Sequence, residues 1–459
     1  MDHLERCRED DVPSIPATIV ADIRARLQGG SLAPGDRLPS TRALADELGV
    51  SRGSVVSAYE QLEGEGILLA SRSGSRIHPD LALTHAQQPA LHFHPSRFPT
   101  TTPPSLLRPG APLEALTGSA WRAAWRAAVA EPHAYPSPGS PCLRHLLAEH
   151  FRLTRAMSVD PEQILITAGT RDGLRAILTA IAVGTPSPVG AEHSAVVPRR
   201  LAVEDPGFGS LRAVPAAIGW ETVLVETDGA GLSPAALTDL TPDAALVTPN
   251  HQFPYGLQMP AVRRRELVEW RRSTPGALLI EDDYDSELRA IHPALVALDP
   301  AGTVLLGSFA KTLTPALGLG YVIVPLAYRE AVEARLIPVS GIAQDALSNF
   351  LATDSLRRHT ARVRREYKYR RGVFERIFPE GRTMDGGLGA IIELPADAEA
   401  RVLERAARAG LAIESLGKYW SGRSGRPGVV VGLGAGSRER LAAALEQLRQ
   451  MVPRPDQSS

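Results

Sequence analysis

This chain of 459 residues lacks several features that would place it outside the cell or in a membrane. Cysteine occurs only at Cys7 and Cys142, which argues against a disulfide framework and suits a reducing compartment. There is no run of about 18 apolar residues, so we expect no transmembrane helix. The first residues, MDHLERCREDDVPS, are polar and lack the apolar core of a secretory signal. We therefore expect a cytoplasmic protein that has no membrane partner.

The sequence also has little net charge and few lysines. The formal net charge is −1, so charge alone indicates no nucleic-acid partner. Lysine occurs only at Lys311, Lys368 and Lys418, and arginine supplies nearly all of the positive charge. Any chemistry that needs a lysine amine therefore has three candidates. At about 150 residues per domain, the length predicts two or three domains.

Residues 14–79 have the pattern of a small separate domain. Ile19, Ile23 and Leu27 recur every four residues and mark one apolar face of a helix. Further along, ILLASRSGSRIHP predicts two short strands around a Ser-Gly turn. Between these segments lie two shorter helical patterns, so the order predicts a helix-turn-helix followed by a β-hairpin wing.

The two short helices have clear boundary signals. Ser40 and Ser51 are good N-caps, and each precedes a segment of helical periodicity. We expect Leu44 and Leu48 to face inward from the first of these helices and Gly49 to end it.

The predicted DNA contacts lie at the starts of both helices and at the wing tip, because a recognition helix places its N-terminal residues on base edges. Arg52 is placed for guanine or phosphate, the serines for phosphate and Gly74 for close approach to the minor groove, with Arg76 beside it. The competing interpretation is a set of solvated arginines, since residues 14–79 hold seven arginines and seven acidic residues. The predicted contact residues are Arg42, Ser51, Arg52, Ser54, Arg72 and Gly74.

The run LAPGDRLPSTRALADELGVSRGSVVSAYEQLEGEGILLASRSGSRI resembles the DNA-binding domain of the GntR family of transcription regulators nearly without a gap. The resemblance implies a winged helix-turn-helix over residues 14–79 and a double-stranded DNA operator as partner.

The rest of the chain predicts an α/β domain. Residues 80–118, rich in Pro, Thr, His and Gln, are expected to form a linker. From residue 119 to 335, ILITAG, AALVTP, ALLIEDDYD and TVLLGSFAK predict buried strands of a mainly parallel sheet, with helical patterns between them. Residues 336–453 predict a smaller α+β part.

Six motifs occur in order along this region: YPSPGSPCLR, ITAGTRDGL, VEDPGF, TPNHQFPYGLQMP, EDDYDSE and GSFAKTLTPALGLGY. Their order resembles fold-type I pyridoxal-phosphate enzymes and, in detail, the MocR subgroup of GntR regulators. The resemblance implies an aminotransferase-like domain. The cofactor needs a lysine amine for a Schiff base and a carboxylate near its ring nitrogen. Lys311 follows an apolar strand, and Asp282 and Tyr284 end another.

The remaining cofactor contacts follow from the same comparison. Gly169, Thr170 and Arg171 stand at a strand-to-helix junction, where backbone N–H groups bind phosphate. Phe208 is expected to stack on the ring, and His251 and Gln252 to line the cleft. The predicted cofactor residues are Lys311, Asp282, Tyr284, Gly169, Thr170, Arg171, Phe208 and Ser308, and we predict no catalytic or metal-binding residues.

Three positions depart from the family pattern. Gly318 stands where the family usually has an arginine for the phosphate, Ala310 replaces a serine before the lysine, and Val430 occupies the place of an arginine for a substrate carboxylate. Two interpretations remain open at this point: the pocket holds pyridoxal phosphate through its other contacts, or it has changed toward a different effector or none.

The combined expectation is a homodimeric transcription regulator of the GntR/MocR type that is not an enzyme and responds to a small-molecule effector. The rival interpretations are a working aminotransferase fused to a DNA-binding domain, and a regulator whose large domain is a cofactor-free dimerisation scaffold.

Overall fold

The computed structural model describes residues 14–71, 74–81, 106–111, 113, 118–184, 198–288, 293–384, 389–422 and 425–453. The chain divides into two compact units, residues 1–102 and 103–459, and their hydrophobic cores are separate. We call them the N-terminal unit and the C-terminal unit. No helix in the described ranges combines the length and the apolar character that a membrane span requires.

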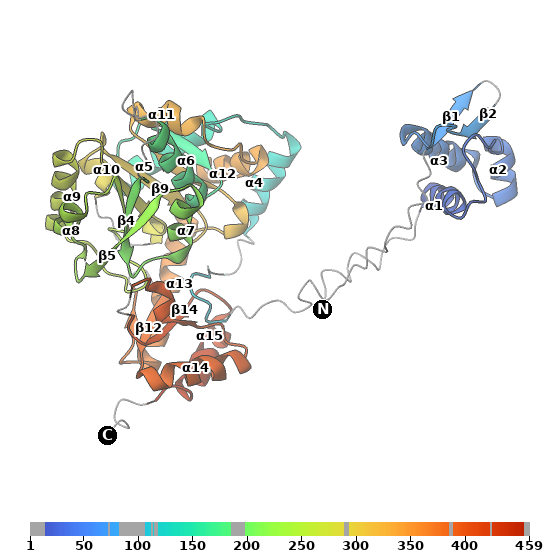
Figure 1. Ribbon diagram of the computed structural model, residues 1–459. Coiled ribbons are helices and arrows are strands. Elements are labelled where there is room, and N and C mark those ends of the chain that lie inside the picture. Colours follow the sequence, from blue (N-terminus) through green and yellow to red (C-terminus); the bar gives the residue numbers. More distant parts are fainter. Residues whose placement is uncertain are drawn as a thin grey trace. The chain divides into compact units, whose positions relative to one another are not determined.

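The described residues of the N-terminal unit form three helices and a hairpin (Figure 1). Ile19, Ile23 and Leu27 are buried against the other helices, as their spacing predicts. The antiparallel hairpin supplies Leu68 and Ile77 to the same core, so the predicted winged helix-turn-helix is confirmed. Its elements are α1 (Ile15–Gln28), α2 (Thr41–Leu48), α3 (Arg52–Gly64), β1 (Leu68–Ser71) and β2 (Gly74–Ile77).

The predicted helix boundaries are also confirmed. Ser40 Oγ accepts a hydrogen bond from the backbone N–H of Ala43, and Gly49 ends α2 in the left-handed conformation, which favours glycine. One detail is wrong: Leu44 is buried, but Leu48 is 49% exposed. The short helix buries Leu44 and Ala45, so its contact face turns away from Leu48.

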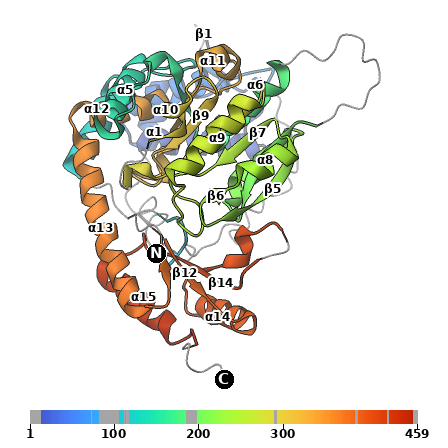
Figure 2. The same ribbon diagram turned by 90° about the vertical axis from the view of Figure 1, so that its left-hand side faces the viewer.

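An eight-stranded sheet forms the centre of the C-terminal unit (Figures 1 and 2). Strands β10 and β6 run antiparallel to their neighbours and the other pairs are parallel, so the predicted mainly parallel sheet is confirmed. In spatial order the strands are β3 (Ile164–Thr167), β10 (Gly320–Ile323), β9 (Thr303–Ser308), β8 (Leu278–Asp283), β7 (Ala244–Val247), β4 (Arg200–Asp205), β5 (Glu221–Asp228) and β6 (Gly231–Leu232).

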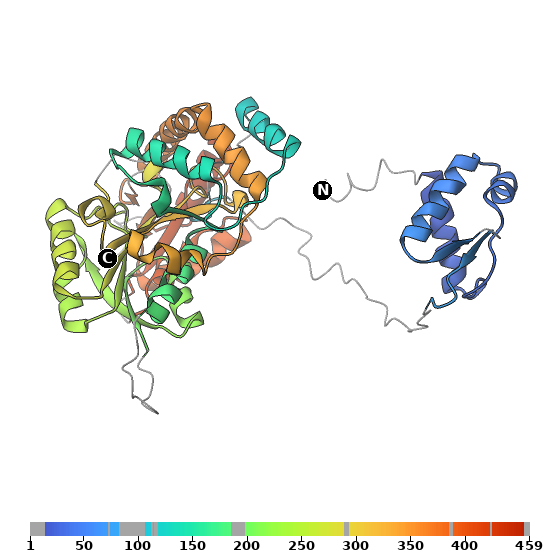
Figure 3. The ribbon, with the colours of Figure 1, turned by 90° about the horizontal axis from the view of Figure 1, so that it is seen from above.

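Helices cover both faces of this sheet (Figure 3). The alternation of side chains along a strand explains why: in β8, Leu278 and Ile280 pack into one core and Leu279 into the other. One face is covered by α6 (Thr170–Gly184), α7 (Gly209–Ala217) and α11 (Leu326–Glu333). The other is covered by α4 (Ser119–Ala130), α5 (Pro141–Arg155), α8 (Pro234–Leu240), α9 (Ala261–Ser273), α10 (Leu295–Leu298) and α12 (Gly341–Ala352).

A long helix, α13 (Ser355–Ile377), connects this large part to a smaller one. The smaller part is an antiparallel sheet of four strands covered by two helices, which confirms the predicted α+β end. Its elements are β11 (Arg382–Thr383), β12 (Gly389–Glu393), α14 (Ala396–Arg408), β13 (Glu414–Ser415), β14 (Gly428–Gly432) and α15 (Arg438–Arg449).

Two expected boundaries differ from the structure. Residues 106–111, expected in the linker, belong to the C-terminal unit: Leu107 is fully buried, and its carbonyl accepts a 2.8 Å hydrogen bond from Gly432 N–H. Helix α12, expected in the smaller part, packs through Leu347 and Phe350 into the core of the large part. The change from large to small part therefore occurs along α13.

Candidate functional site

A cavity of about 670 Å³ in the C-terminal unit brings together residues from distant parts of the sequence. All eight residues predicted to bind the cofactor line it, and so do the three positions that depart from the family pattern. The lining residues that the sequence predicted or singled out are Gly169, Thr170, Arg171, Phe208, Asp282, Tyr284, Ser308, Ala310, Lys311, Gly318 and Val430.

The topology of the sheet explains this convergence. Strands β8 and β9 are parallel neighbours, so Asp282 and Ser308 lie at the same edge of the sheet, where their strands end. Strand β3 and strand β9 both pair antiparallel with β10, so the turn that contains Gly169 and begins α6 lies at that edge too. Lys311 follows β9 by three residues.

Asp282 is the most perturbed carboxylate in the cavity. Its side chain is almost fully buried, and Oδ1 has no hydrogen-bond partner among the described residues. Burial, and after it the negative charges of Asp283 and Asp285, raises the pKa of Asp282 well above the usual range. A carboxylate in this state is suited to a positively charged N–H group, and a protonated pyridine ring supplies one.

The neighbouring carboxylate, Asp283, points elsewhere. It forms a buried ion pair with Arg155, at 2.5 Å between Oδ2 and Nη1. The two adjacent aspartates therefore differ in function: Asp283 holds α5 to the sheet, and Asp282 presents an oxygen to the cavity.

This difference leads to a first prediction. In the cofactor-free protein, Asp282→Asn is expected to raise stability at pH 7 to 8 by about 1–3 kcal/mol, because asparagine cannot ionise at a site where burial penalises a charge. An acid with a raised pKa binds more protons when folded, so its contribution to stability falls as pH rises above its ordinary pKa. The gain should therefore shrink toward pH 4. Urea unfolding from pH 5 to 8 measures it.

The matched control for Asp282→Asn is Asp283→Asn, which should have the opposite sign. Breaking its ion pair leaves the buried Arg155 guanidinium without its carboxylate, which costs about 3–5 kcal/mol. If both substitutions destabilise the cofactor-free protein to the same extent, the interpretation of Asp282 as a buried acid with a raised pKa is wrong.

Lys311 is buried near the carboxylates of Asp282 and Asp285. Burial lowers the pKa of Lys311, partly offset by the negative charges of Asp285 and Asp282. Its Nζ donates a 2.5 Å hydrogen bond to the carbonyl oxygen of Gly110, which lies in a segment that the sequence predicted to be part of the linker. Gly110 has a φ of 73°, and a Cβ at this position would lie 2.8 Å from Nζ. The lysine amine is therefore held close to the backbone of residues 106–111.

Tyr284 lines the cavity, and its hydroxyl contacts His251. The two rings stack at 5.6 Å between centroids, and His251 Nδ1 lies 2.5 Å from Oδ2 of Asp285. The prediction that His251 and Gln252 line the cavity is wrong. Both are buried and are absent from the lining of the cavity. His251 Nδ1 lies against Asp285, and Nε2 of Gln252 donates to the carbonyls of Pro206 and Phe253.

The lining of the cavity also includes donors for an anion. Gly169 is left-handed, with a φ of 98°, and open space where a Cβ would stand, and Thr170 begins α6. Arg171 is exposed at the cavity wall. Ser308 Oγ accepts a hydrogen bond from Ala310 N–H at 3.1 Å, which leaves its hydroxyl proton available. These groups supply backbone N–H, hydroxyl and guanidinium donors even though Gly318 and Ala310 lack side-chain donors.

The cavity also has walls that the sequence did not predict. Phe253 packs edge-on against Phe208 at 5.7 Å, and Met384, Glu414, Lys418 and Tyr419 come from the small part. Lys418 forms a 3.0 Å ion pair with Glu414 and so is locally neutralised. These residues lie in loops and short elements without periodicity, so no local signal could have identified them.

The predicted DNA-reading residues lie at the helix starts of the N-terminal unit. Arg42 and Arg52 are exposed, in the first turns of α2 and α3. Ser51 caps α3 by accepting from Ser54 N–H at 3.1 Å, and the two hydroxyls lie 2.9 Å apart. Their first role is thus to define the start of the recognition helix.

The predicted wing contacts can be followed only in part. Gly74 begins β2 with a φ of 113°, which favours glycine, and Arg76 is exposed two residues later. Arg72 lies outside the described residues.

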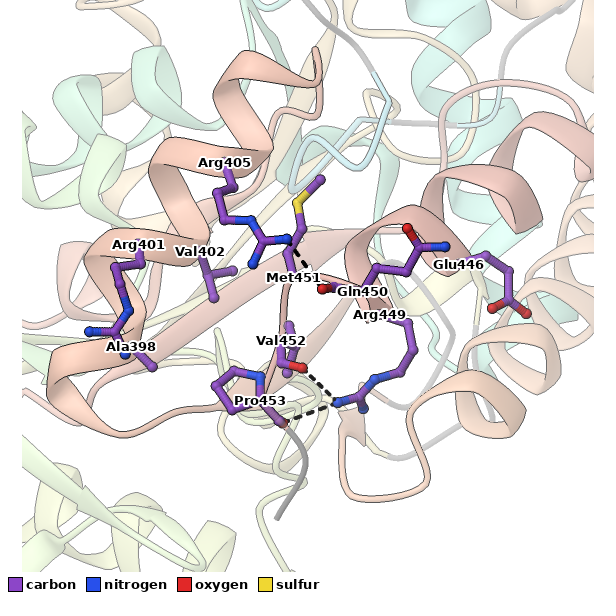
Figure 4. A pocket seen from close by; sticks show the side chains of 10 residues that line it. All are labelled: Ala398, Arg401, Val402, Arg405, Glu446, Arg449, Gln450, Met451, Val452 and Pro453. Atoms are coloured by element: carbon purple, nitrogen blue, oxygen red, sulfur yellow. Dashed lines mark hydrogen bonds between the residues drawn. The ribbon is translucent and has the colours of Figure 1, made fainter. Parts of the chain in front are cut away.

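A second hollow, of about 550 Å³, lies between α14 and the end of α15 (Figure 4). Arg449 donates to the carbonyls of Val452 and Pro453 there, and Arg405 donates to that of Gln450. No residue that the sequence singled out lines it, and its arginines mainly hold the end of the chain to the small part.

The two units together define a class of protein, a DNA-binding regulator that carries an aminotransferase-like domain. Residues 16–77 match the family described as bacterial regulatory proteins of the gntR family. The C-terminal unit has the fold of an archaeal alanine:glyoxylate aminotransferase (TM-score 0.67, 19% identity, 78% of this chain and 92% of that one). It is also similar to the α-aminoadipate aminotransferase LysN of Thermus thermophilus (TM-score 0.64, 22% identity, 75% and 91%).

Relatives of full length place the chain more narrowly. It is 42% identical to the HTH-type pyridoxine biosynthesis transcriptional regulator PdxR of Corynebacterium glutamicum, over 96% of both chains. It is 28% identical to the probable rhizopine catabolism regulatory protein MocR of Rhizobium meliloti, over 96% of this chain and 94% of that one. The chain belongs to the MocR subgroup of the GntR family of transcription regulators. Both relatives are named as regulators rather than as enzymes.

Proposed function

We propose that the cavity of the C-terminal unit binds pyridoxal phosphate and that the protein regulates vitamin B6 synthesis genes in response to it. The observation that carries this proposal is the pairing, in one cavity, of the buried Lys311 amine with an Asp282 oxygen that lacks a partner among the described residues. The name of the similar Corynebacterium regulator, a regulator of pyridoxine biosynthesis, supports the choice of genes.

The residues present fit this cofactor. When bound, pyridoxal phosphate supplies an aldehyde that condenses with an amine. Lys311 would provide the amine, and its lowered pKa increases the neutral, nucleophilic fraction. Asp282 would hold a proton on the ring nitrogen, and Phe208, which is 43% exposed, would cover one face of the ring. Tyr284 would hold the ring hydroxyl.

The phosphate would lie at the start of α6. Backbone N–H groups of Gly169 and Thr170, with the positive end of the helix dipole, would bind its oxygens, and Arg171 and Ser308 would add charge and a hydroxyl donor. Without an arginine at position 318, these contacts would have to provide the phosphate affinity alone. A weaker, reversible site is suited to sensing a concentration.

The lining also supports sensing rather than transamination. An amino-acid substrate needs a cation for its carboxylate, and Val430 places an apolar side chain at the position where relatives often carry an arginine. The effector would then be the cofactor itself. In a homodimer, its binding would shift the population between two arrangements that present the DNA-binding units differently.

This function is tested by DNA binding with and without the effector. Purified cofactor-free protein is titrated with a duplex from the intergenic region beside its own gene, at fixed salt, in the presence and absence of saturating pyridoxal phosphate. We expect the affinity to change at least about fivefold, which corresponds to a coupling of about 1 kcal/mol. An unchanged affinity would leave the large domain as a scaffold, and sustained keto-acid formation from added amino donors would favour the enzyme.

A further inference from the structure

Helix α13 has a large net positive charge, whereas the rest of the chain has a net negative charge. Its 23 residues contain nine basic and two acidic side chains, a net charge of +7. The remainder of the chain has 41 basic and 49 acidic residues, a net charge of −8. A chain that is close to neutral overall therefore has a large net positive charge on one helix.

Four of these arginines lie on one exposed side of the helix, three of them close together and the fourth near the C-terminal end. Arg358, Arg362, Arg365 and Arg376 are exposed and lie within about 60° of one another around the helix axis, since a helix turns about 100° per residue. We call this set the α13 stripe. It is about 27 Å long, at 1.5 Å per residue. Figure 2 shows α13 running along the edge of the C-terminal unit, from the large part to the small part.

No carboxylate among the described residues forms an ion pair with the arginines of the stripe. Arg358 donates to the carbonyl of Thr353 and to Ser355 Oγ, and Arg362 lies 3.1 Å from the ring nitrogen of His359. These partners carry no negative charge. Arg365 and Arg376 form no ion pair with any residue that the structure describes.

The other arginines of α13 have partners within the protein. Arg357 pairs with Asp354. Arg370 is buried, is paired with Glu366 and donates to four backbone carbonyls in the loop between β14 and α15. Arg364 donates to the carbonyl of Glu287. The helix therefore has two functions: arginines on its inner side hold the two parts of the unit together, and the α13 stripe leaves its charge to the solvent.

The DNA-binding unit lacks such charge. Residues 14–79 hold seven arginines and seven acidic residues, so they provide little of the phosphate attraction that dominates affinity for DNA. Guanidinium groups bind phosphate oxygens in a bidentate manner, and a duplex carries about one negative charge per 1.7 Å of its axis. From these observations we infer that the α13 stripe binds the phosphate backbone of the same DNA whose bases the N-terminal unit reads.

Helix α14 offers a matched control. It is also exposed and has three arginines, Arg401, Arg405 and Arg408, but its three acidic residues make it neutral. Arg401 pairs with Asp397 at 2.9 Å, and Arg408 pairs with Glu404 (Figure 4 shows Arg401 and Arg405). Phosphate contacts are not expected there.

The test compares two triple variants of the full-length protein, R358Q/R362Q/R365Q and R401Q/R405Q/R408Q. Glutamine keeps helix propensity while removing the charge. Affinity for the intergenic duplex beside the gene, and for a scrambled duplex of equal length, is measured between about 50 and 200 mM salt. A plot of log affinity against log salt concentration should have a shallower slope for the stripe variant than for the wild type. The difference should be about 0.9 for each phosphate contact that is lost. Its affinity should fall about tenfold or more on both duplexes alike at the low-salt end, and the α14 variant should match the wild type.

Because the inference rests on the DNA-binding function, the two can fail separately. If the wild type binds neither duplex, the regulator function fails. If the wild type binds and the stripe variant keeps its salt dependence within about half a unit, the α13 stripe makes no phosphate contact and the inference is overturned. If the stripe variant has a different mass in solution from the wild type, the α13 stripe is a contact between copies of the chain. This result would also overturn the inference.

Discussion

Lys311→Ala is expected to abolish covalent capture of pyridoxal phosphate and the visible absorption that the bound cofactor gives the purified protein. The reason is that Lys311 is the lysine that lines the cavity beside Asp282, while Lys418 is paired with Glu414 at its rim. Affinity for the cofactor should fall at least about a hundredfold, since the interactions with ring and phosphate remain but the covalent bond cannot form. Titration of cofactor-free protein, followed by absorbance, measures both effects.

The scarcity of lysine makes the control simple. Lys368→Ala, on the exposed side of α13 and away from the cavity, should behave as the wild type. Reduction of the loaded wild type with borohydride, followed by peptide mapping, should place the label on the peptide that contains Lys311. A label on Lys368 or Lys418, or an unchanged spectrum in Lys311→Ala, would refute the assignment of this lysine.

Arg52→Ala is expected to remove sequence preference from DNA binding. Arg52 is the first residue of the recognition helix, is exposed, and follows a serine cap that fixes the direction of the helix start. An arginine that contacts a base edge contributes about 1–3 kcal/mol of discrimination, so affinity for the operator should fall about 5- to 150-fold. Affinity for a scrambled duplex should change by no more than the contribution of a single phosphate. Fluorescence anisotropy with both duplexes gives the ratio.

Arg26→Ala serves as the control for Arg52→Ala. Arg26 lies in the last turn of α1, is about half exposed, and faces Asp22 at 3.8 Å. Its removal should leave the ratio of specific to scrambled affinity unchanged. An equal fall on both duplexes for Arg52→Ala would mean that this arginine contacts phosphate alone and that bases are read elsewhere.

Local signals explain which parts of the fold were predictable. Serine caps, the four-residue spacing of Ile19, Ile23 and Leu27, and the apolar runs of the central strands all act over a few residues, and the structure confirms each of them. The side of a short helix that becomes buried depends on its neighbours, so Leu48 was misplaced. Helix α12 packs on α4 and α5 from more than 180 residues along the chain, which no local pattern can indicate.

The same reasoning applies to the cavity. Asp282, Ser308 and Lys311 were predictable because strand ends in a parallel sheet converge on one edge. His251 and Gln252 lie in a turn, and the conformation of the turn decides whether a side chain points into the cavity. In the structure, both side chains instead bond to neighbouring residues outside the cavity lining. The contribution of Gly110 was not predictable, because a Pro- and Thr-rich stretch has the composition of a linker whether or not its end packs onto the protein.

The Nζ atom of Lys311 has two roles: it is the amine of the cavity, and it donates a hydrogen bond to the backbone of Gly110. A protonated lysine has three N–H bonds, one of which reaches the Gly110 oxygen, whereas a nitrogen bonded to an aldehyde carbon retains at most one. A ligand that bonds to this amine would therefore compete with the Gly110 carbonyl for its N–H groups and would weaken one attachment of residues 106–111. Chemistry at this amine and the attachment of residues 106–111 would thus be coupled through a single hydrogen bond, with no change required in the sheet beneath it.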